Sequence, residues 1–273
     1  MIVEIRPGGS PRGITTMLEF VNGCARKVAL NAASEPEVSY SLPLLTGTLF
    51  HALLEVYYTK GYFEPEDVAW RGVDLSHPNF GAAEEKAFRT FRAYRLAYDE
   101  KELGTVLGAE VPFDIQDPAV IGVPYTGYID LVVKLTKRDC KRITKTRRVD
   151  LDPGIYVVDH KTTGGVYANT EERHRTSVQL PAYSKAYEYT TGAKVRGALI
   201  NLITTQRDPK KYTFALLPSA ASNARLLAVT TRANALGWPE IPTDPTEAHA
   251  NASRCFDYNS VCPFWIGAQC SGY

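Results

Sequence analysis

The sequence predicts an α/β protein in which a mixed β-sheet is flanked by helices. Apolar residues follow helical spacing in the first hundred residues and strand-like patterns after that. The expected elements come in the order helices, three strands, helix, two strands, helix, which is typical of a sheet covered by helices. With 273 residues, of which 44% are hydrophobic, the chain can bury a sizeable core. A disulfide-stapled module and a disordered chain are therefore excluded.

Three helices are predicted before the first strand. Thr16-Met17-Leu18-Glu19 has the form of a capping box, and the apolar residues after it predict a helix over 16–31. A second helix is expected over 45–60 and a third over 82–101. The third helix interleaves aromatic residues with arginines; at helical spacing these rings indicate a core face, although such rings could also stack on single-stranded bases.

Five strands follow, with helices between and after them. The strands are predicted over 106–113, 127–133, 154–159, 195–205 and 211–216, and the third is apolar enough to be central in the sheet. Further helices are expected over 173–191 and 219–236. From Gly237 on, the chain is rich in Pro, Asn, Ser and Cys and is expected to be irregular.

The charge and the targeting signals limit the partners. Lys and Arg number 31 against 30 Asp and Glu, so no global positive field attracts nucleic acid, and an anionic partner must be held by a local patch or by metal ions. The N-terminus does not resemble a secretory signal, and the weakly charged stretch over 40–58 contains proline, histidine and glutamate, so no membrane segment is expected. The five cysteines, an odd number, predict reduced thiols in a cytoplasmic protein.

Two carboxylates and a lysine are the candidate active site. Asp130 and Asp159 each end a hydrophobic stretch, where a carboxylate is costly unless it is paired or bound to metal. Lys161 lies two residues after Asp159 and therefore faces the same side of a strand. Such a set could hold a divalent cation and activate water. Asp-x-Lys alone is more often a surface pair, and His51 alone is more often a core or surface histidine, so the prediction depends on the whole set.

The set resembles the RecB-like branch of the PD-(D/E)XK nuclease superfamily. The matching pieces, in the order of that family, are Gly47-x-x-x-His51-x-x-x-Glu55, Gly127-Tyr128-Ile129-Asp130, Val157-Val158-Asp159-His160-Lys161-Thr162 and Gln179-x-x-x-Tyr183. The resemblance implies a restriction-endonuclease-like fold and a Mg²⁺ or Mn²⁺ site made by His51, Asp130, Asp159 and the backbone carbonyl of His160.

The resemblance also assigns the remaining roles. It implies that Lys161 is the catalytic lysine and that Gln179 and Tyr183 support the site and contact DNA. Without the family, Gln179 and Tyr183 would be equally consistent with one face of an amphipathic helix. Glu55 and Glu110 are expected to support the site or the fold rather than to bind metal.

The cysteines resemble those of RecB-like nucleases that carry a [4Fe-4S] cluster, with one cysteine near the N-terminus and three near the C-terminus. The implied cluster ligands are Cys24, Cys255, Cys262 and Cys270, with Cys140 left over. Their spacing is looser than usual, and zinc or free thiols are the alternatives. The expected organisation is one nuclease domain over 1–273. It comprises a helical insertion over 32–104, a catalytic core over 105–236 and a cysteine-rich tail over 237–273 that is joined to Cys24.

A basic segment over 137–148 is expected to form a hairpin loop near the active cleft. It holds seven basic residues and one acidic residue. The candidate phosphate contacts are Lys137, Arg138, Lys141, Arg142, Arg147 and Arg148. A solvated charged turn is the alternative interpretation.

The predicted function is a metal-dependent DNA exonuclease that acts on single-stranded or end-exposed DNA. A structure-specific endonuclease of the same fold and a non-catalytic Fe-S DNA-binding subunit are the alternatives. A chain without helicase motifs or a Walker phosphate loop resembles the short CRISPR-associated and bacteriophage members of the family. That resemblance implies recombination or CRISPR-adaptation proteins as partners.

Overall fold

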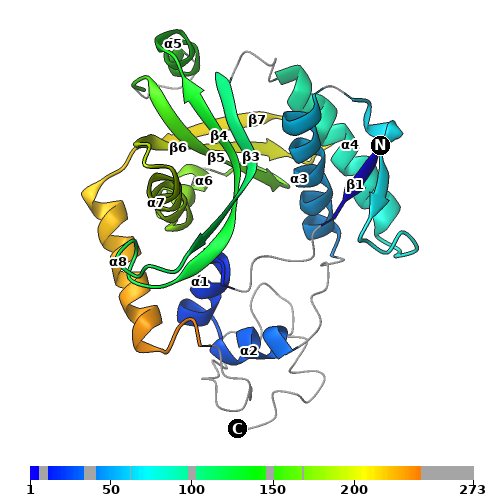
Figure 1. Cartoon of the computed structure of the whole chain (residues 1–273). Helices are drawn as coiled ribbons and strands as arrows, with labels where there is room; N and C mark the ends of the chain where they lie inside the picture. The colour runs from blue at the N-terminus through cyan, green and yellow to red at the C-terminus, as the bar shows by residue number, and fades with distance from the viewer. Residues whose placement is uncertain are drawn as a thin grey trace. The chain divides into compact units, whose positions relative to one another are not determined.

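The computed structural model describes residues 1–5, 12–33, 41–61, 63–97, 103–145, 151–167 and 169–240. The chain divides into two compact units. The first comprises Met1–Pro7, Val38–Phe113 and Tyr128–Ser222, and the second comprises Gly8–Glu37, Asp114–Gly127 and Asn223–Tyr273. The chain leaves the first unit twice and returns, so each unit is built from segments that are distant in sequence (Figure 1).

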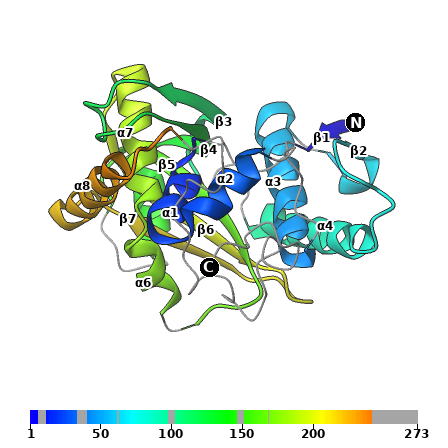
Figure 2. The same cartoon turned by 90° about the horizontal axis from the view of Figure 1, so that it is seen from below.

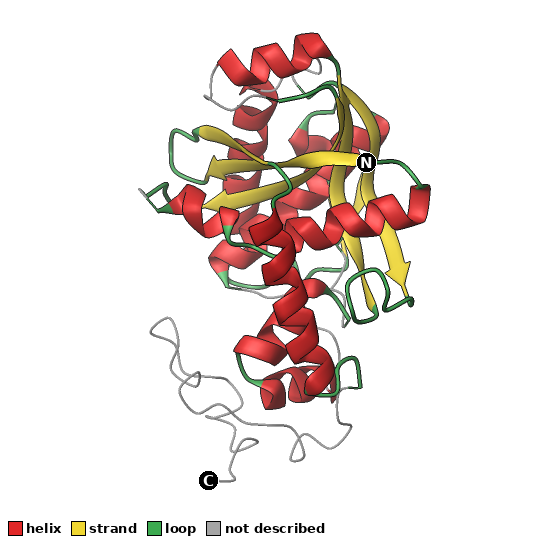
Figure 3. Ribbon diagram, turned by 90° about the vertical axis from the view of Figure 1, so that its left-hand side faces the viewer, coloured by secondary structure: helices red, strands yellow, loops and turns green. Residues whose placement is uncertain are grey.

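A five-stranded mixed sheet organises the first unit. Its strand order is β3-β4-β5-β6-β7. The bounds are β3 Thr105–Ile115, β4 Tyr125–Leu135, β5 Gly154–Thr163, β6 Val195–Thr204 and β7 Lys211–Leu216. β4 and β5 are antiparallel, β5 and β6 parallel, and β6 and β7 antiparallel. The strands are twisted relative to one another (Figure 3), as is usual for such sheets.

Helices cover both faces of this sheet. α3 (Leu42–Lys60) packs against α4 (Phe80–Ala97) and contacts β5, while α7 (Gln179–Thr191) contacts β5 and β6. Figure 2 shows α7 and the α3–α4 pair on opposite sides of the strands. The core on the α3–α4 side includes Leu49 and Leu53 of α3 and Tyr156 and Val158 of β5, all fully buried. These alternate residues of β5 define the face that points to α3 and α4.

The smaller elements of the first unit connect these layers. They are β1 (Ile2–Glu4) and β2 (Ala69–Arg71), which pair in parallel, the short 3-10 helix η1 (Pro65–Asp67), α5 (Lys137–Lys145) and α6 (Thr170–Arg175). α6 and α7 form the crossover that the parallel pair β5–β6 requires.

The second unit contains α1 (Ile14–Asn22), α2 (Ala25–Ala33) and most of α8 (Ala220–Ala235). The ring of Trp238 lies 5.6 Å from that of Phe20 of α1, and its indole N–H donates to the carbonyl of Pro124 at 3.2 Å. Cys24, between α1 and α2, is buried. The tryptophan therefore joins three separate segments of this unit.

The predicted mixed sheet with flanking helices is confirmed, and the strands and the helices α3, α4 and α8 lie within a few residues of their expected bounds. The single helix expected over 16–31 is wrong, because it breaks at Gly23. There the N–H of Gly23 donates to the carbonyl of Glu19, and a Cβ on Gly23 would lie 2.6 Å from that oxygen. The helix expected over 173–191 is divided into α6 and α7, and the Ser177 hydroxyl accepts the N–H of Gln179 at the break.

The expected hairpin loop at 137–148 is also wrong, because Lys137–Lys145 form α5. Thr136 and Asp139 make a reciprocal cap: the N–H of Thr136 donates to Asp139 Oδ2 at 2.8 Å, and the N–H of Asp139 donates to the Thr136 hydroxyl at 3.3 Å. This Thr-x-x-Asp pattern is a variant of the capping box and starts the helix.

Of the tail expected to be irregular, the structure describes residues 237–240; residues 241–273, with Cys255, Cys262 and Cys270, lie outside the described part. Among the described helices, none combines the length and the apolar character needed to cross a membrane.

Candidate metal centre

The strand pair β4–β5 brings the two predicted aspartates together. Leu131 pairs with Val158, so Asp130 and Asp159 occupy the next position of the same register. Asp130 Oδ2 accepts the backbone N–H of His160 at 2.8 Å. An aspartate at the end of the ladder is thus held by the backbone of the neighbouring strand.

Asp159 and Lys161 form an ion pair on one face of β5, as their spacing predicts. Lys161 Nζ donates to Asp159 Oδ1 at 2.9 Å. The Asp159 side chain is 3% exposed, whereas that of Lys161 is 35% exposed. The carboxylate therefore fixes the lysine, whose side chain as a whole is partly exposed.

Helix α3 brings His51 to the same place. Gly47 lies one turn before His51 on the same face, and a Cβ on Gly47 would lie 3.1 Å from the Thr162 hydroxyl of β5. The missing side chain thus permits a close approach of α3 to β5. His51 Nδ1 lies 3.5 Å from Asp130 Oδ2. The spacing Gly47-x-x-x-His51 accordingly has a physical reason. The glycine lets α3 approach β5 closely, and His51, one turn later on the same face, is thereby brought near Asp130.

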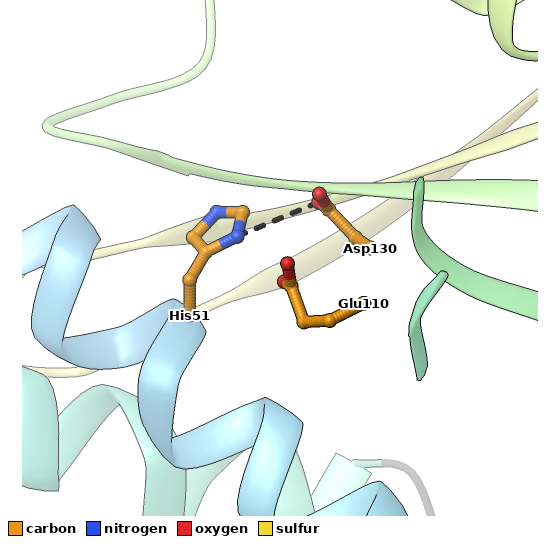
Figure 4. A group of neighbouring side chains, drawn as sticks. All are labelled: His51, Glu110 and Asp130. Atoms are coloured by element: carbon orange, nitrogen blue, oxygen red, sulfur yellow. Dashed lines mark ion pairs between the residues drawn. The ribbon is translucent and has the colours of Figure 1, made fainter. Parts of the chain in front are cut away.

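Glu110 of β3 completes the group. One ligand atom from each of His51, Glu110 and Asp130 lies within 4.8 Å of the others, and Figure 4 shows the three side chains pointing toward one another. Glu110 was expected to support the site or the fold, and its carboxylate stands in a group of side chains that could hold a metal ion. An acidic residue within a strand next to the Asp130 strand is the sequence signal that could have identified it.

Glu110 has an unusual backbone for a residue in a strand. Its φ is 46°, a left-handed conformation that side-chain-bearing residues rarely adopt. Left-handed residues in strands are typical of β-bulges, which re-aim a side chain and are frequent next to active sites. Such conformations cost free energy and persist at functional sites. The backbone at Glu110 thus indicates that the position of this carboxylate is maintained at a cost.

The electrostatics of the site favour a cation. Burial alone would raise the pKa of Asp130, but His51, Lys161 and the N–H of His160 outweigh it and hold that pKa below its usual value. Burial raises the pKa of Asp159, with Lys161 opposing and Asp130 adding to the effect. Burial alone would lower the pKa of Lys161, but Asp159 and Asp130 raise it above its usual value. The ammonium group is therefore charged at neutral pH.

Gln179 and Tyr183 lie at the start of α7, on the other side of the sheet from α3. Gln179 Nε2 donates to the Tyr183 hydroxyl at 2.7 Å. Burial and the charge of Asp130 raise the pKa of Tyr183, so its hydroxyl stays protonated near the carboxylates. The ring also meets Phe113 of β3 edge-on at 5.7 Å. The structure therefore brings Tyr183 near Asp130, with Gln179 bonded to it, and their supporting role stays a prediction.

His160 lies between the two members of the ion pair. Its N–H binds Asp130, whereas its side chain is buried among the rings of α3 and α4. The coordination of metal by its backbone carbonyl stays a prediction.

Four of the six predicted DNA-contacting residues lie on α5, away from Asp130 in sequence. α5 follows the end of β4, five residues beyond Asp130, which corresponds to about 17 Å along a strand. Arg142 is paired with Asp139 at 3.1 Å. Arg147 and Arg148 lie outside the described residues. Lys137, Arg138 and Lys141 remain predicted phosphate contacts, on an element that begins beyond the end of the Asp130 strand.

The aromatic residues of α4 belong mainly to the core. Phe91 and Tyr94 are fully buried, and Phe88 stacks on Trp70 with ring centroids 6.1 Å apart. Their interpretation as a core face therefore holds for the two buried rings. Of the predicted cluster ligands, the structure describes Cys24 alone, which is buried; Cys140, on α5, is also buried.

Comparison with known proteins identifies the family of this site. A family model described as the PD-(D/E)XK nuclease superfamily matches residues 16–264. A solved structure named "Putative exonuclease", from Eubacterium rectale, is similar with a TM-score of 0.49 and 15% identity, over 96% of this chain and 93% of that chain. The structure of SSO0001 is similar with a TM-score of 0.31 and 13% identity, over 78% of this chain and 85% of that one. No curated protein sequence matches. The family match spans the whole candidate site, from His51 to Tyr183.

Proposed function

The chain belongs to the PD-(D/E)XK nuclease superfamily, and on this premise we propose that it is a divalent-metal-dependent deoxyribonuclease of the RecB-like branch. Its proposed substrate is single-stranded or end-exposed DNA, which it digests as an exonuclease. The RecB-like assignment is supported by the order of its four motifs and by their meeting in one part of the first unit. The exonuclease mode is supported by the family resemblance of those motifs.

One observation carries the proposal, namely the meeting of His51, Glu110 and Asp130 beside the Asp159–Lys161 pair. Carboxylate oxygens and an imidazole nitrogen suit Mg²⁺ or Mn²⁺. Three acidic groups face a single charged lysine, so the site has negative charge for a cation to neutralise. The residues present therefore fit a divalent metal. His51, Glu110 and Asp130 are the proposed ligands, with Asp159 next to them.

The chain's own groups have separable roles in phosphodiester hydrolysis. A divalent cation, when bound, lowers the pKa of water and draws charge from a phosphoryl oxygen. Lys161, held by Asp159, offers a fixed positive charge where negative charge develops on the phosphate. Gln179 holds the Tyr183 hydroxyl beside the carboxylates, where it can orient the substrate phosphate. These groups are positioned in advance, so little reorganisation is needed during reaction.

We also propose that Cys24, Cys255, Cys262 and Cys270 bind a [4Fe-4S] cluster that joins the tail to the first helices of a single nuclease domain. The buried position of Cys24 between α1 and α2 supports this. Absorbance near ~400 nm and about four iron atoms per chain are expected in anaerobically purified protein. Cys24→Ser should lose both, whereas the matched variant Cys140→Ser should keep them. A colourless, iron-free wild type would refute the cluster.

The nuclease proposal is tested with 5′- and 3′-labelled single strands incubated with Mg²⁺, Mn²⁺ or EDTA. Digestion is expected with either cation and not with EDTA. Asp130→Asn and Lys161→Met should abolish it, because each removes one of the charges at the site. Glu85→Gln is the matched control: its side chain is 77% exposed on α4 and paired with Arg89, and it should digest DNA like the wild type.

Two outcomes of these assays would contradict the proposal. Unaltered digestion by Asp130→Asn and Lys161→Met would exclude this site as the active site. Cleavage of circular single-stranded DNA would replace the exonuclease by an endonuclease, since an obligate exonuclease leaves a circle intact.

A further inference from the structure

The imidazole of His160 is a buried polar group to which the proposed reaction gives no role. It is 1% exposed, and neither ring nitrogen has a hydrogen-bond partner among the residues that the structure describes. Buried polar atoms are normally satisfied. The ring must therefore be retained at this position for a reason other than hydrogen bonding within the described part of the chain.

Aromatic rings of α3 and α4 surround this imidazole. It stacks on Tyr58 with centroids 6.0 Å apart and an interplanar angle of 13°. It meets Tyr94 edge-on at 5.5 Å and His51 edge-on at 6.3 Å. The hydroxyls of Tyr58 and Tyr94 are hydrogen-bonded at 2.5 Å, which joins the two helices behind the ring. The flat ring of His160 thus packs among Tyr58, Tyr94 and the proposed metal ligand His51.

The backbone of the same residue holds the other ligand. The N–H of His160 donates to Asp130 Oδ2 at 2.8 Å, and this oxygen is also the atom 3.5 Å from His51 Nδ1. Because side chains alternate along a strand, Asp159 and Lys161 point to one face of β5 while the ring of His160 points to the other. Residue 160 consequently contacts His51 through its side chain and Asp130 through its backbone.

We propose that His160 is a positioning residue of the metal centre, whose ring sets the place of His51 and whose N–H sets the place of Asp130. This inference rests on the proposed function, since it assumes that His51 and Asp130 bind metal. It assigns the ring a packing role, in which its flat shape matters and its nitrogens do not.

The test compares Mn²⁺ binding, by electron paramagnetic resonance or calorimetry, in the full-length wild type and in variants at position 160. His160→Ala should raise the Kd for Mn²⁺ by about 10- to 100-fold, the usual effect of removing a group that orients a metal ligand. His160→Phe retains the flat ring and should restore most of the affinity that His160→Ala loses. His160→Leu fills the space without a flat ring and should bind more weakly than His160→Phe.

Leu199→Ala is the matched control for simple loss of core packing. Leu199 is fully buried in the same core, on β6 opposite Val158, and is similar in size to histidine. It should lower the melting temperature and leave the Kd for Mn²⁺ unchanged. The two variants thus separate metal affinity from stability. If His160 had only a structural role, His160→Ala would weaken Mn²⁺ binding no more than Leu199→Ala does.

The possible results are distinguishable. The inference is overturned if His160→Ala binds Mn²⁺ like the wild type, or if Leu199→Ala weakens binding as much. It is also overturned if a folded His160→Phe loses binding, because a nitrogen would then be essential. If His160→Ala does not fold, the comparison of His160→Phe with His160→Leu decides in the same way. A wild type that binds no Mn²⁺ would refute the proposed function and this inference together.

Discussion

Replacing Glu110 by glycine or by alanine should separate the cost of its backbone from the use of its carboxylate. Both variants remove the carboxylate, but only glycine relieves the left-handed φ of 46°. That conformation costs a side-chain-bearing residue roughly 1–2 kcal/mol. Glycine avoids this cost, but the greater freedom of its unfolded chain offsets about 0.4–1 kcal/mol of the gain in stability. Glu110→Gly should therefore have a free energy of unfolding about 1 kcal/mol higher than that of Glu110→Ala.

The assay is urea unfolding of both variants in EDTA, followed by Mn²⁺ binding. A difference of this size corresponds to roughly 2–4 °C in melting temperature for a chain of this length. Both variants should lose Mn²⁺ affinity to the same degree, by more than the roughly tenfold expected when only an orienting partner of a ligand is removed. Equal stability of the two variants would show that the backbone at Glu110 is not strained. Wild-type affinity in Glu110→Ala would remove Glu110 from the site.

Three other changes should give equally specific results. Gly47→Ala should weaken Mn²⁺ binding measured by calorimetry, because the new Cβ would lie 3.1 Å from the Thr162 hydroxyl and displace α3; unchanged binding would show that the helix has room. Asp139→Ala should lower the free energy of unfolding by about 1 kcal/mol through loss of the cap, with the cleavage rate unaltered; a loss of cleavage would implicate α5 in the reaction. Saturating Mn²⁺, at about 100 times its Kd, should stabilise the wild type by about 2.7 kcal/mol in urea unfolding. Asp130→Asn should show no such gain, and an equal gain would place the metal elsewhere.

The sequence predicts the elements whose pattern is repeated over many residues. The helix of His51 and the strands of Asp130 and Asp159 could be located from apolar spacing alone, because each buries a continuous face. The helix breaks at Gly23 and Ser177 could not be located in this way, because each depends on a single residue and its local hydrogen bonds. The periodicity of apolar residues is a property of many positions together, so it does not reveal a break caused by one residue.

The site was predictable to the extent that its chemistry lies in motifs. Asp130, Asp159, Lys161 and His51 stand in recognisable order, and the structure brings them together. Glu110 was expected only to support the site or the fold, because its orientation depends on a φ value, which no spacing rule contains. Regular alternation along the strand gives no indication of a left-handed residue.

The position of β3 in the sheet has a consequence for the choice of metal. Asp130 comes from β4, which has a neighbouring strand on each side, whereas Glu110 comes from β3, which among the described strands has a neighbour on one side. An edge strand is hydrogen-bonded to the sheet along one side, so fewer ladder bonds hold its backbone. Mg²⁺ requires near-ideal octahedral geometry at short distances, while larger ions accept looser arrangements. We expect the edge carboxylate to adjust to the ionic radius, so that one centre accepts both Mg²⁺ and Mn²⁺ while Asp130 stays fixed.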